Sequence, residues 1–223
     1  MKKIALIVLS LFLLSCENEP VDFTPIDNNQ IVLDTLKNYS DYILGSFNGK
    51  FLVSTHVFNK GYSYTTSPTP NNLSHIQFQI AYKLLDNNVE KSVFVSYSFL
   101  ESKTKLNPVN YKYNYFSDFV NFFNRGHFDY YQISQPIENI HNIGIDYQNY
   151  YEINNDVNRF TTYKYNEQIT PDNFNFTIDS IKAIQNPIKK VEVYYSFKCI
   201  GVNNYSDKFK MKNGKGKSTF EWQ

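Results

Sequence analysis

The sequence predicts an all-β protein, arranged as an antiparallel two-sheet sandwich with one or two short helices. Three observations predict this class. Apolar and polar residues alternate with a period of two in several stretches, which is typical of strands that turn one face to a core. Tyrosine and phenylalanine, which favour strands, occur 19 times each in 223 residues. Alanine, the strongest helix former, occurs only as Ala5, Ala81 and Ala183, which argues against a helical bundle.

The N-terminus carries an export signal. Two lysines precede an apolar run over residues 4–14, which is too short to span a bilayer and is typical of a signal peptide. The run ends in Leu13-Leu14-Ser15-Cys16, which resembles the bacterial lipobox, where cleavage leaves a lipidated cysteine. We therefore expect removal of residues 1–15, lipid that includes palmitate on Cys16, and a tether over residues 16–40 that can include a short helix.

The residues after Cys16 predict where the protein is located. Glu17-Asn18-Glu19 is acidic and resembles the short signal that sends lipoproteins of Bacteroidota-type bacteria to the outer face of the outer membrane. We therefore expect a lipid-anchored protein of the outer membrane, at the cell surface, that contacts the membrane through its N-terminal lipid.

Residues 41–223 hold the predicted strands of the sandwich domain. The clearest hairpin joins residues 76–84 to residues 93–99, because Asp86-Asn87-Asn88 between them is a strong turn sequence. Asn48-Gly49 predicts a second turn. Further strands are predicted over residues 42–47, 51–58, 143–147, 159–163, 174–178, 191–199, 208–212 and 217–222, and helices over residues 31–39 and 117–124.

Cys199 falls on the apolar face of the strand predicted over residues 191–199. It is the only cysteine besides Cys16, so no disulfide can form within the chain once Cys16 carries lipid. We expect Cys199 to be a buried free thiol.

The last two predicted strands carry alternating lysines. Asn213-Gly214 predicts a turn between residues 208–212 and 217–222. The lysines around it are Lys208, Lys210, Lys212, Lys215 and Lys217. They could contact anionic headgroups or polysaccharide, or block edge-to-edge pairing of a terminal strand. The second interpretation is favoured, because the apolar residues between the first three lysines are expected to face the core.

Turn and strand motifs follow one another in a recognisable order. They are Asn48-Gly49-Lys50, residues 144–147, residues 160–162, residues 174–178 and Asn213-Gly214-Lys215. With the lipobox and the tether before them, they resemble a group of Bacteroidota-type surface lipoproteins of undescribed function with an immunoglobulin-like β-sandwich. The resemblance implies that fold and an envelope location, and it supplies no catalytic residues. The aromatic segment over residues 111–131 departs from it.

The composition argues against several classes of function. A formal net charge of +1 lacks the basic footprint of a protein that binds nucleic acid, so no nucleic-acid partner is expected. The sequence holds no nucleophile elbow, phosphate-binding loop, dinucleotide-binding motif or zinc-protease motif. We therefore expect no enzyme activity, no cofactor and no metal. An envelope hydrolase acting on polysaccharide or peptide is the alternative, because paired carboxylates can meet in space alone, and His127 and Asp129 are its best candidates.

Aromatic residues form the main candidate for a binding site. Rings and amides crowd residues 111–131 and 147–155, and flat rings with such neighbours suit a sugar or a protein surface. The candidate ligand-binding residues are Tyr111, Tyr113, Tyr130, Tyr131, Tyr150 and Tyr151. Core packing is the alternative for these rings. The sequence thus predicts a non-catalytic envelope lipoprotein, a binding or structural module whose partner is a glycan or an envelope protein.

Overall fold

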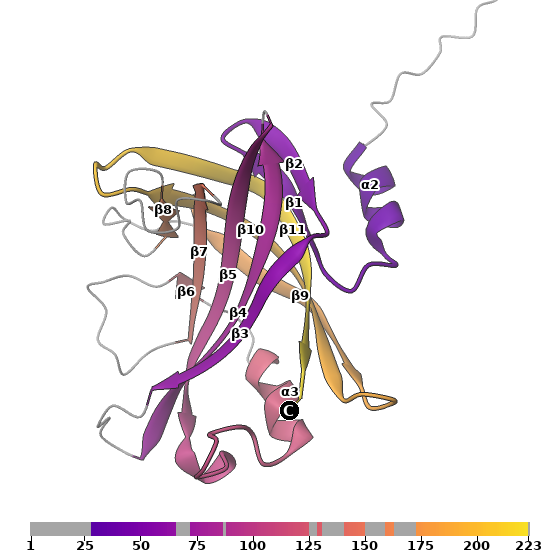
Figure 1. Cartoon of the computed structure of the whole chain (residues 1–223), viewed down its shortest axis with the longest axis vertical. Helices are drawn as coiled ribbons and strands as arrows, with labels where there is room; N and C mark the ends of the chain where they lie inside the picture. Colours follow the sequence, from indigo (N-terminus) through magenta and orange to yellow (C-terminus); the bar gives the residue numbers. More distant parts are fainter. Residues whose placement is uncertain are drawn as a thin grey trace, which may run out of the picture. The chain divides into compact units, whose positions relative to one another are not determined.

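The computed structural model describes residues 28–65, 72–86, 88–124, 129–130, 141–149, 159–162 and 173–222 (Figure 1). The chain forms two compact units, Met1–Lys37 and Asn38–Gln223. In the first unit, α2 spans Asn28–Leu36, so the helix predicted over residues 31–39 is confirmed with both ends nearer the N-terminus. The predicted signal peptide and Cys16 lie outside the described residues.

The second unit is all-β, as predicted, and its described strands belong to one curled sheet. The strands are β1 (Tyr42–Phe47), β2 (Lys50–Ser54), β3 (Val57–Thr65), β4 (Leu73–Asp86), β5 (Val89–Ser102), β6 (Asp129–Tyr130), β7 (His141–Asn149), β8 (Phe160–Thr161), β9 (Asn175–Ile184), β10 (Lys190–Val202) and β11 (Lys208–Glu221). A 3-10 turn, η1 (Lys103–Lys105), follows β5. The helix predicted over residues 117–124 is confirmed as α3 (Phe116–Phe123).

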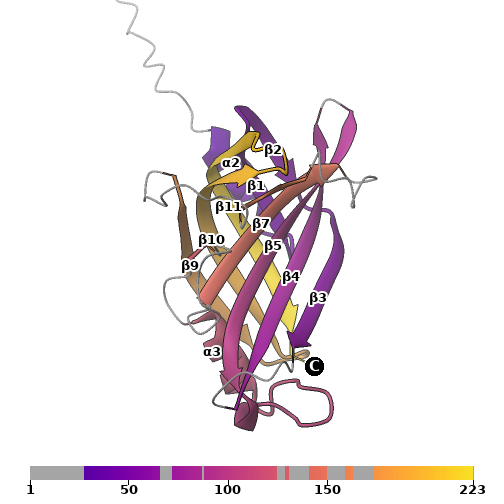
Figure 2. The same cartoon turned by 90° about the vertical axis from the view of Figure 1, so that its left-hand side faces the viewer.

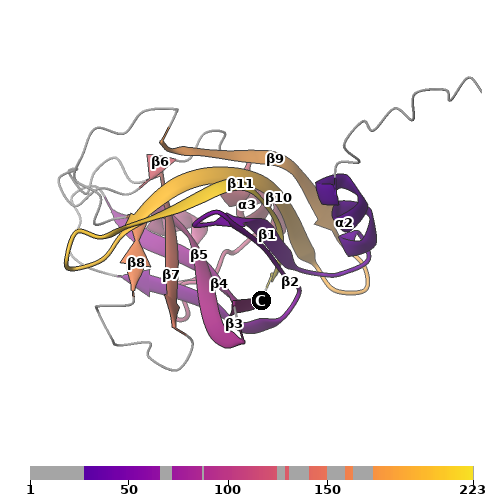
Figure 3. The ribbon, with the colours of Figure 1, turned by 90° about the horizontal axis from the view of Figure 1, so that it is seen from above.

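The strands pair in the order β2-β1-β11-β10-β8-β7-β5-β4-β3. β9 pairs with β10, and β6 pairs with β7 as the one parallel partner among the described strands. Figure 2 shows β7, β5, β4 and β3 side by side, and Figure 3 shows how the sheet curls toward its other end. An immunoglobulin-like two-sheet sandwich is not confirmed. Alternation within a strand predicts which face is buried, whereas the partner of each strand depends on contacts distant in sequence.

Both predicted hairpin turns before residue 90 are confirmed. β4 and β5 pair from Leu73↔Ser102 to Asp86↔Val89. Asn48 and Gly49 both have positive φ, 53° and 88°, which is what a tight turn between β1 and β2 requires.

Aromatic rings fill the core between the sheet and α3. Phe119, Phe122 and Phe123 are all buried, because their spacing of three and four residues places them on one face of α3. Phe78 of β4 packs against this face, with ring centroids 4.9 Å from Phe122 and 5.3 Å from Phe123. The ring centroid of Phe220, in β11, lies 5.5 Å from that of Phe78. α3 therefore covers one end of the curled sheet (Figure 1).

Cys199 of β10 is buried within this core, as predicted for a free thiol. Its Sγ lies 3.9 Å from Sδ of Met211 on the neighbouring strand. The prediction that Cys199 points to the apolar face is confirmed.

The segment over residues 51–58 forms two strands, not the single strand predicted. β2 ends at Ser54 and β3 begins at Val57. Ser54 Oγ accepts a hydrogen bond from the main-chain N–H of His56 at 3.1 Å and donates to the carbonyl of Lys83. A serine hydroxyl that binds the backbone two residues on favours a turn over a continuing strand, so the chain changes direction here.

Asn213-Gly214 is not a hairpin turn, and that prediction is wrong. β11 runs through it, and an extra residue of β11 is accommodated between Phe197 and Cys199 of β10. Asn213 adopts a φ of 52°, which suits a bulge as well as a turn. A Cβ on Gly214 would lie only 2.4 Å from the Phe197 ring. The pair therefore kinks β11 and makes room for a core ring.

The lysines of β11 do not protect a sheet edge, because β11 lies between β1 and β10. Lys208, Lys210 and Lys212 are exposed, whereas Lys217 is buried. The Lys217 ammonium lies 3.3 Å from the Glu192 carboxylate and donates to the Tyr39 carbonyl at 3.1 Å. The predicted edge-blocking role is thus overturned by the position of the strand.

Three tyrosine hydroxyls lie inside the core. Tyr82 donates to the carbonyl of Lys217 at 2.8 Å and lies 3.1 Å from Ser218 Oγ. Burial raises the pKa of Tyr82 and of Tyr97 well above the usual value, and it raises the pKa of Tyr195 to about 12. The folded state therefore keeps these phenols protonated in mildly alkaline solution.

We expect the protein to lose stability as the pH rises from about 10 toward 12. The unfolded chain releases its tyrosine protons near pH 10, whereas the folded state holds them, so folding is penalised increasingly through this range. Tyr195 alone should account for about 3 kcal/mol of lost unfolding free energy. Urea unfolding at a series of pH values measures the unfolding free energy, and the ultraviolet absorbance of tyrosinate, recorded in parallel, measures the ionisation of the tyrosines. Tyr195→Phe should weaken the pH dependence, and complete tyrosinate formation near pH 10 in a still-folded chain would contradict the assignment.

Candidate binding pocket

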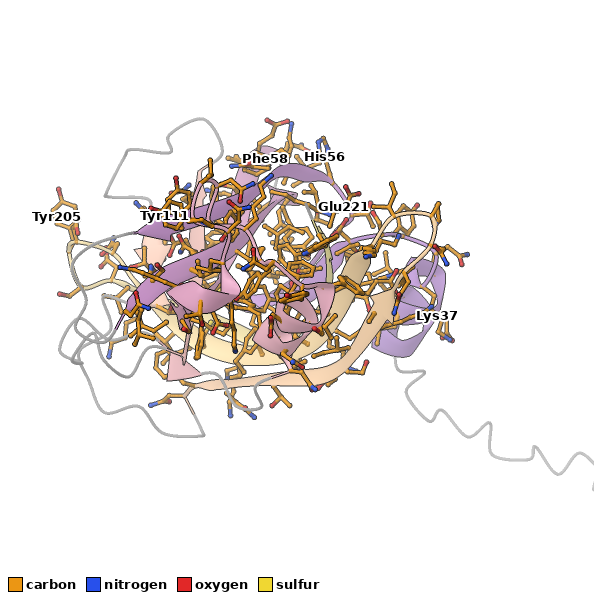
Figure 4. All side chains as sticks on the ribbon, turned by 90° about the horizontal axis from the view of Figure 1, so that it is seen from below. Lys37, His56, Phe58, Tyr111, Tyr205 and Glu221 are labelled. Carbon is orange, nitrogen blue, oxygen red and sulfur yellow. The ribbon has the colours of Figure 1, made fainter. Side chains whose placement is uncertain are left out.

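A pocket of about 270 Å³ lies between β3 and the C-terminal end of β11. Its walls come from five short stretches of the chain. They are residues 60–62 of β3, Phe78 of β4, residues 112–113 before α3, Phe119 of α3, and residues 219–221 of β11 with Trp222 directly after it. Glu221, labelled in Figure 4, lies beside the side chains that fill this end of the sheet.

The pocket exists because β1 is shorter than β11. Pairing between β1 and β11 begins at Tyr42↔Lys217, so the last residues of β11 have no partner strand on that side among the described residues. β3 is the last strand at the opposite end of the order and pairs only with β4. The two edges therefore approach each other without a shared ladder of main-chain hydrogen bonds.

Asp41 connects these edges through its side chain. The Asp41 carboxylate accepts from the main-chain N–H of Thr219 at 2.7 Å and from the Lys60 ammonium at 2.7 Å. Ser40 Oγ donates to the same carboxylate at 2.8 Å. Lys60 also donates to the Thr219 carbonyl at 2.8 Å. Since Asp41 is only 4% exposed, its charge is compensated by these partners and not by water.

Ring surfaces form the floor and walls of the pocket. The ring centroid of Tyr62 lies 5.0 Å from that of Phe78, and Phe119 and Phe220 each lie 5.5 Å from Phe78. Trp222 packs against Phe116 at 6.2 Å, and the Lys189 ammonium lies 4.6 Å from the Trp222 ring. These separations are typical of packed aromatic pairs and of a cation over a ring.

The polar tips of these wall residues already have partners within the protein. Tyr62 Oη donates to the Tyr111 carbonyl, and burial raises the pKa of Tyr62. Tyr113 Oη donates to Glu101 at 3.3 Å, and Trp222 Nε1 donates to the Tyr113 carbonyl at 3.2 Å. These three rings therefore present apolar surface to a ligand, and the polar side chains of the lining are Lys60, Lys112, Thr219 and Glu221.

The structure places the predicted tyrosines in different environments. Tyr113 lines the pocket but is 4% exposed, so it packs mainly as a core residue. The Tyr111 ring stacks on that of Tyr64 with centroids 4.3 Å apart, and the Tyr111 carbonyl accepts a hydrogen bond from the Tyr62 hydroxyl. Tyr130 lies in β6, but its side chain is outside the described part of the structure. Tyr131, Tyr150 and Tyr151 also lie outside the described residues.

Tyr147, which the sequence grouped with Tyr150 and Tyr151, is a core residue. It is buried, and its ring stacks on Phe209 with centroids 4.1 Å apart. Its hydroxyl donates to Asp86 at 3.3 Å. Core packing therefore accounts for this ring.

Sequence reasoning missed most of the pocket. Tyr62, Phe78 and Phe220 lie in strands whose alternation predicts burial, and nothing local distinguishes a pocket wall from a core position. Trp222 was the available signal, because it is the single tryptophan of the chain and follows the last strand.

The two residues of the metal-binding candidate are not among the described side chains. His127 lies outside the described residues, and the side chain of Asp129 does too. Within the described ranges, no group of three or more histidine, cysteine or carboxylate side chains could hold a metal ion. No helix in those ranges is long and apolar enough to cross a membrane.

Comparisons of the chain with protein-family models, with curated proteins and with solved structures find no match.

We expect Asp41→Ala to lower the free energy of unfolding by about 3 kcal/mol, because the Lys60 ammonium and the Thr219 N–H lose a buried partner. Asp41→Asn should cost less, since its amide oxygen can still accept from Thr219. Urea unfolding measures both. The matched control is Asp34→Ala, which removes a carboxylate from an exposed ion pair with Lys37 and should cost about 0.5 kcal/mol or less. Equal losses in Asp41→Ala and Asp34→Ala would show that Asp41 does not hold the edges together.

Proposed function

We propose that this chain is a non-catalytic surface lipoprotein, anchored in the outer membrane through lipid on Cys16, which binds a ligand or partner of the cell envelope in the pocket between β3 and β11. The observation that carries the binding role is the pocket itself. Five segments converge on it, and a buried carboxylate at Asp41 holds its edges. Concave sites lined by rings with a few polar groups at the mouth are typical of binding sites.

The chemistry of the lining supports binding over catalysis. Among the described lining residues, Glu221 is the only carboxylic acid, and none is a histidine, cysteine or serine. Hydrolysis of a glycoside needs two carboxyl groups, and nucleophilic catalysis needs a nucleophile with a base beside it. The alternative of an envelope hydrolase that uses His127 and Asp129 therefore gains no support from the pocket.

The export features of the sequence support the proposed location. The apolar run, the lipobox-like Leu13–Cys16 and the acidic residues after it all belong to the same interpretation. A balanced charge supports an envelope glycan or protein as the partner, and not nucleic acid.

Radiolabelled palmitate should enter the wild-type chain in its native host, because cleavage after Ser15 would expose Cys16 for acylation. Cys16→Ala should remove the label. Cys199→Ala is the matched control, since Cys199 is buried and should not affect labelling. Equal labelling of wild type and Cys16→Ala would refute lipidation at this residue.

Trp222→Ala should abolish binding of the protein to its ligand on combined arrays of glycans and short peptides, because it removes one wall of the pocket. Tyr205→Ala is the matched control: Tyr205 is 67% exposed, and Figure 4 shows it pointing away from the body of the molecule. Circular dichroism and thermal melting would establish that both variants fold. Binding that survives Trp222→Ala in a folded chain would remove the pocket from the proposed function, and turnover of any arrayed compound would overturn the non-catalytic assignment.

A further inference from the structure

The ring side chains of the pocket have their polar tips bonded within the protein, which disfavours a sugar against them. The phenol of Tyr62, the phenol of Tyr113 and the indole N–H of Trp222 are each bonded within the protein. Thr219 Oγ1 donates to the Ser40 carbonyl at 2.5 Å. A sugar ring placed against these groups would give up hydrogen bonds to water, and the charged side chains that could replace them are those of Lys60, Lys112 and Glu221. An apolar group would lose only its contact with water, which favours its entry.

The main chain at the mouth of the pocket presents a strand edge that none of the described strands pairs with. The N–H of Trp222 donates to the Lys189 carbonyl at 2.9 Å, on the side of β10. Thr219 directs its N–H and carbonyl to the opposite side, toward Asp41 and Lys60. Because main-chain groups alternate along an antiparallel strand, Glu221 directs its own N–H and carbonyl to the same side as Thr219.

No described strand pairs with Glu221 on that side, since the pairing of β1 ends at Lys217. The Glu221 side chain is exposed, and its main chain borders the pocket. A ring-lined hollow next to an unpaired strand edge is the arrangement that proteins use to bind extended peptides: the edge pairs with the peptide main chain, and the hollow takes one side chain.

The volume of the pocket also fits a single group. At about 270 Å³ it lies just below the range of about 300–1,000 Å³ that holds a whole drug-sized ligand. It can therefore hold one ring or branched side chain of a larger partner.

We infer that the pocket binds an extended peptide segment of an envelope protein, which inserts one aromatic or branched apolar side chain among Tyr62, Phe78 and Trp222 and pairs its main chain with Glu221. This inference rests on the proposed binding function and names the class of partner. The peptide cannot pair with Thr219, because the Thr219 N–H is already bonded to Asp41 and its carbonyl to Lys60.

The test uses the full chain in lipid nanodiscs and follows the fluorescence of Trp222, the single tryptophan. The probes are three acetylated and amidated tripeptides, namely Ala-Phe-Ala, Ala-Ser-Ala and Ala-Phe-Ala with an N-methylated phenylalanine, together with N-acetylglucosamine. We expect saturable binding of the first peptide. Binding should weaken about tenfold or more with serine, which lacks the apolar ring, and about tenfold with the N-methylated peptide, which lacks one main-chain donor. The sugar should give no saturable change.

Two variants test the strand edge from the side of the protein. Glu221→Pro removes the N–H that points away from β10, and proline is tolerated at such edge positions. We expect it to weaken binding of the phenylalanine peptide about tenfold. Tyr205→Ala is the control: Tyr205 is 67% exposed and does not line the pocket, so this variant should bind the peptide like the wild type. Thermal melting checks that both variants fold. If Glu221→Pro does not fold, the N-methylated peptide still tests whether the peptide main chain pairs with the strand edge.

Several results would overturn the inference. Sugar binding without peptide binding would assign the pocket to a glycan and leave the proposed binding function intact. Equal binding of the phenylalanine and serine peptides would exclude an apolar anchor. Unchanged binding in folded Glu221→Pro, or of the N-methylated peptide, would exclude pairing with the strand edge. Failure of the proposed function is a separate outcome, seen as array binding that persists in Trp222→Ala.

Discussion

The curled sheet depends on one carboxylate, Asp41, at the start of β1. The sheet cannot close through main-chain pairing at this point, because β1 stops pairing with β11 at Lys217. An unpaired strand edge leaves donors and acceptors that need partners when they are buried. Asp41 and Lys60 supply them to Thr219 and neutralise each other's charge. The same contacts hold β3 beside β11, so they create the mouth of the pocket.

The density of aromatic rings explains the unusual features of β11. Gly214 and Gly216 leave room for the rings of Phe197 and Tyr195, since a Cβ at either position would lie within 2.4 Å of a ring carbon. Asn213 makes the kink that this arrangement needs. Buried phenols then require hydrogen bonds, and Tyr82 finds one at the Lys217 carbonyl across the core. The packing of the core rings therefore determines the path of β11.

Closure of the sheet and recognition of a partner use different groups of the pocket. The polar tips of Tyr62, Tyr113 and Trp222 are hydrogen-bonded within the protein, so these three residues offer a partner their ring surfaces. The main chain of Glu221 is the part of the edge that Asp41 and Lys60 do not occupy. This division favours a partner that offers an apolar group beside a main-chain amide, which is a peptide.

The sequence alone determined the all-β class, the hairpin between β4 and β5, the turn at Asn48-Gly49, both short helices and the burial of Cys199. These features were predictable because alternation, turn residues and helical spacing are local signals. It also carries the export and lipidation predictions, which depend on residues 1–19. Only the tertiary structure decided that the strands join in one sheet and that β11 passes through Asn213 to a central position. It also decided that Tyr62, Phe78 and Trp222 meet in a pocket. These outcomes depend on which strands pair, and pairing is set by packing between segments far apart in sequence, which no local pattern encodes.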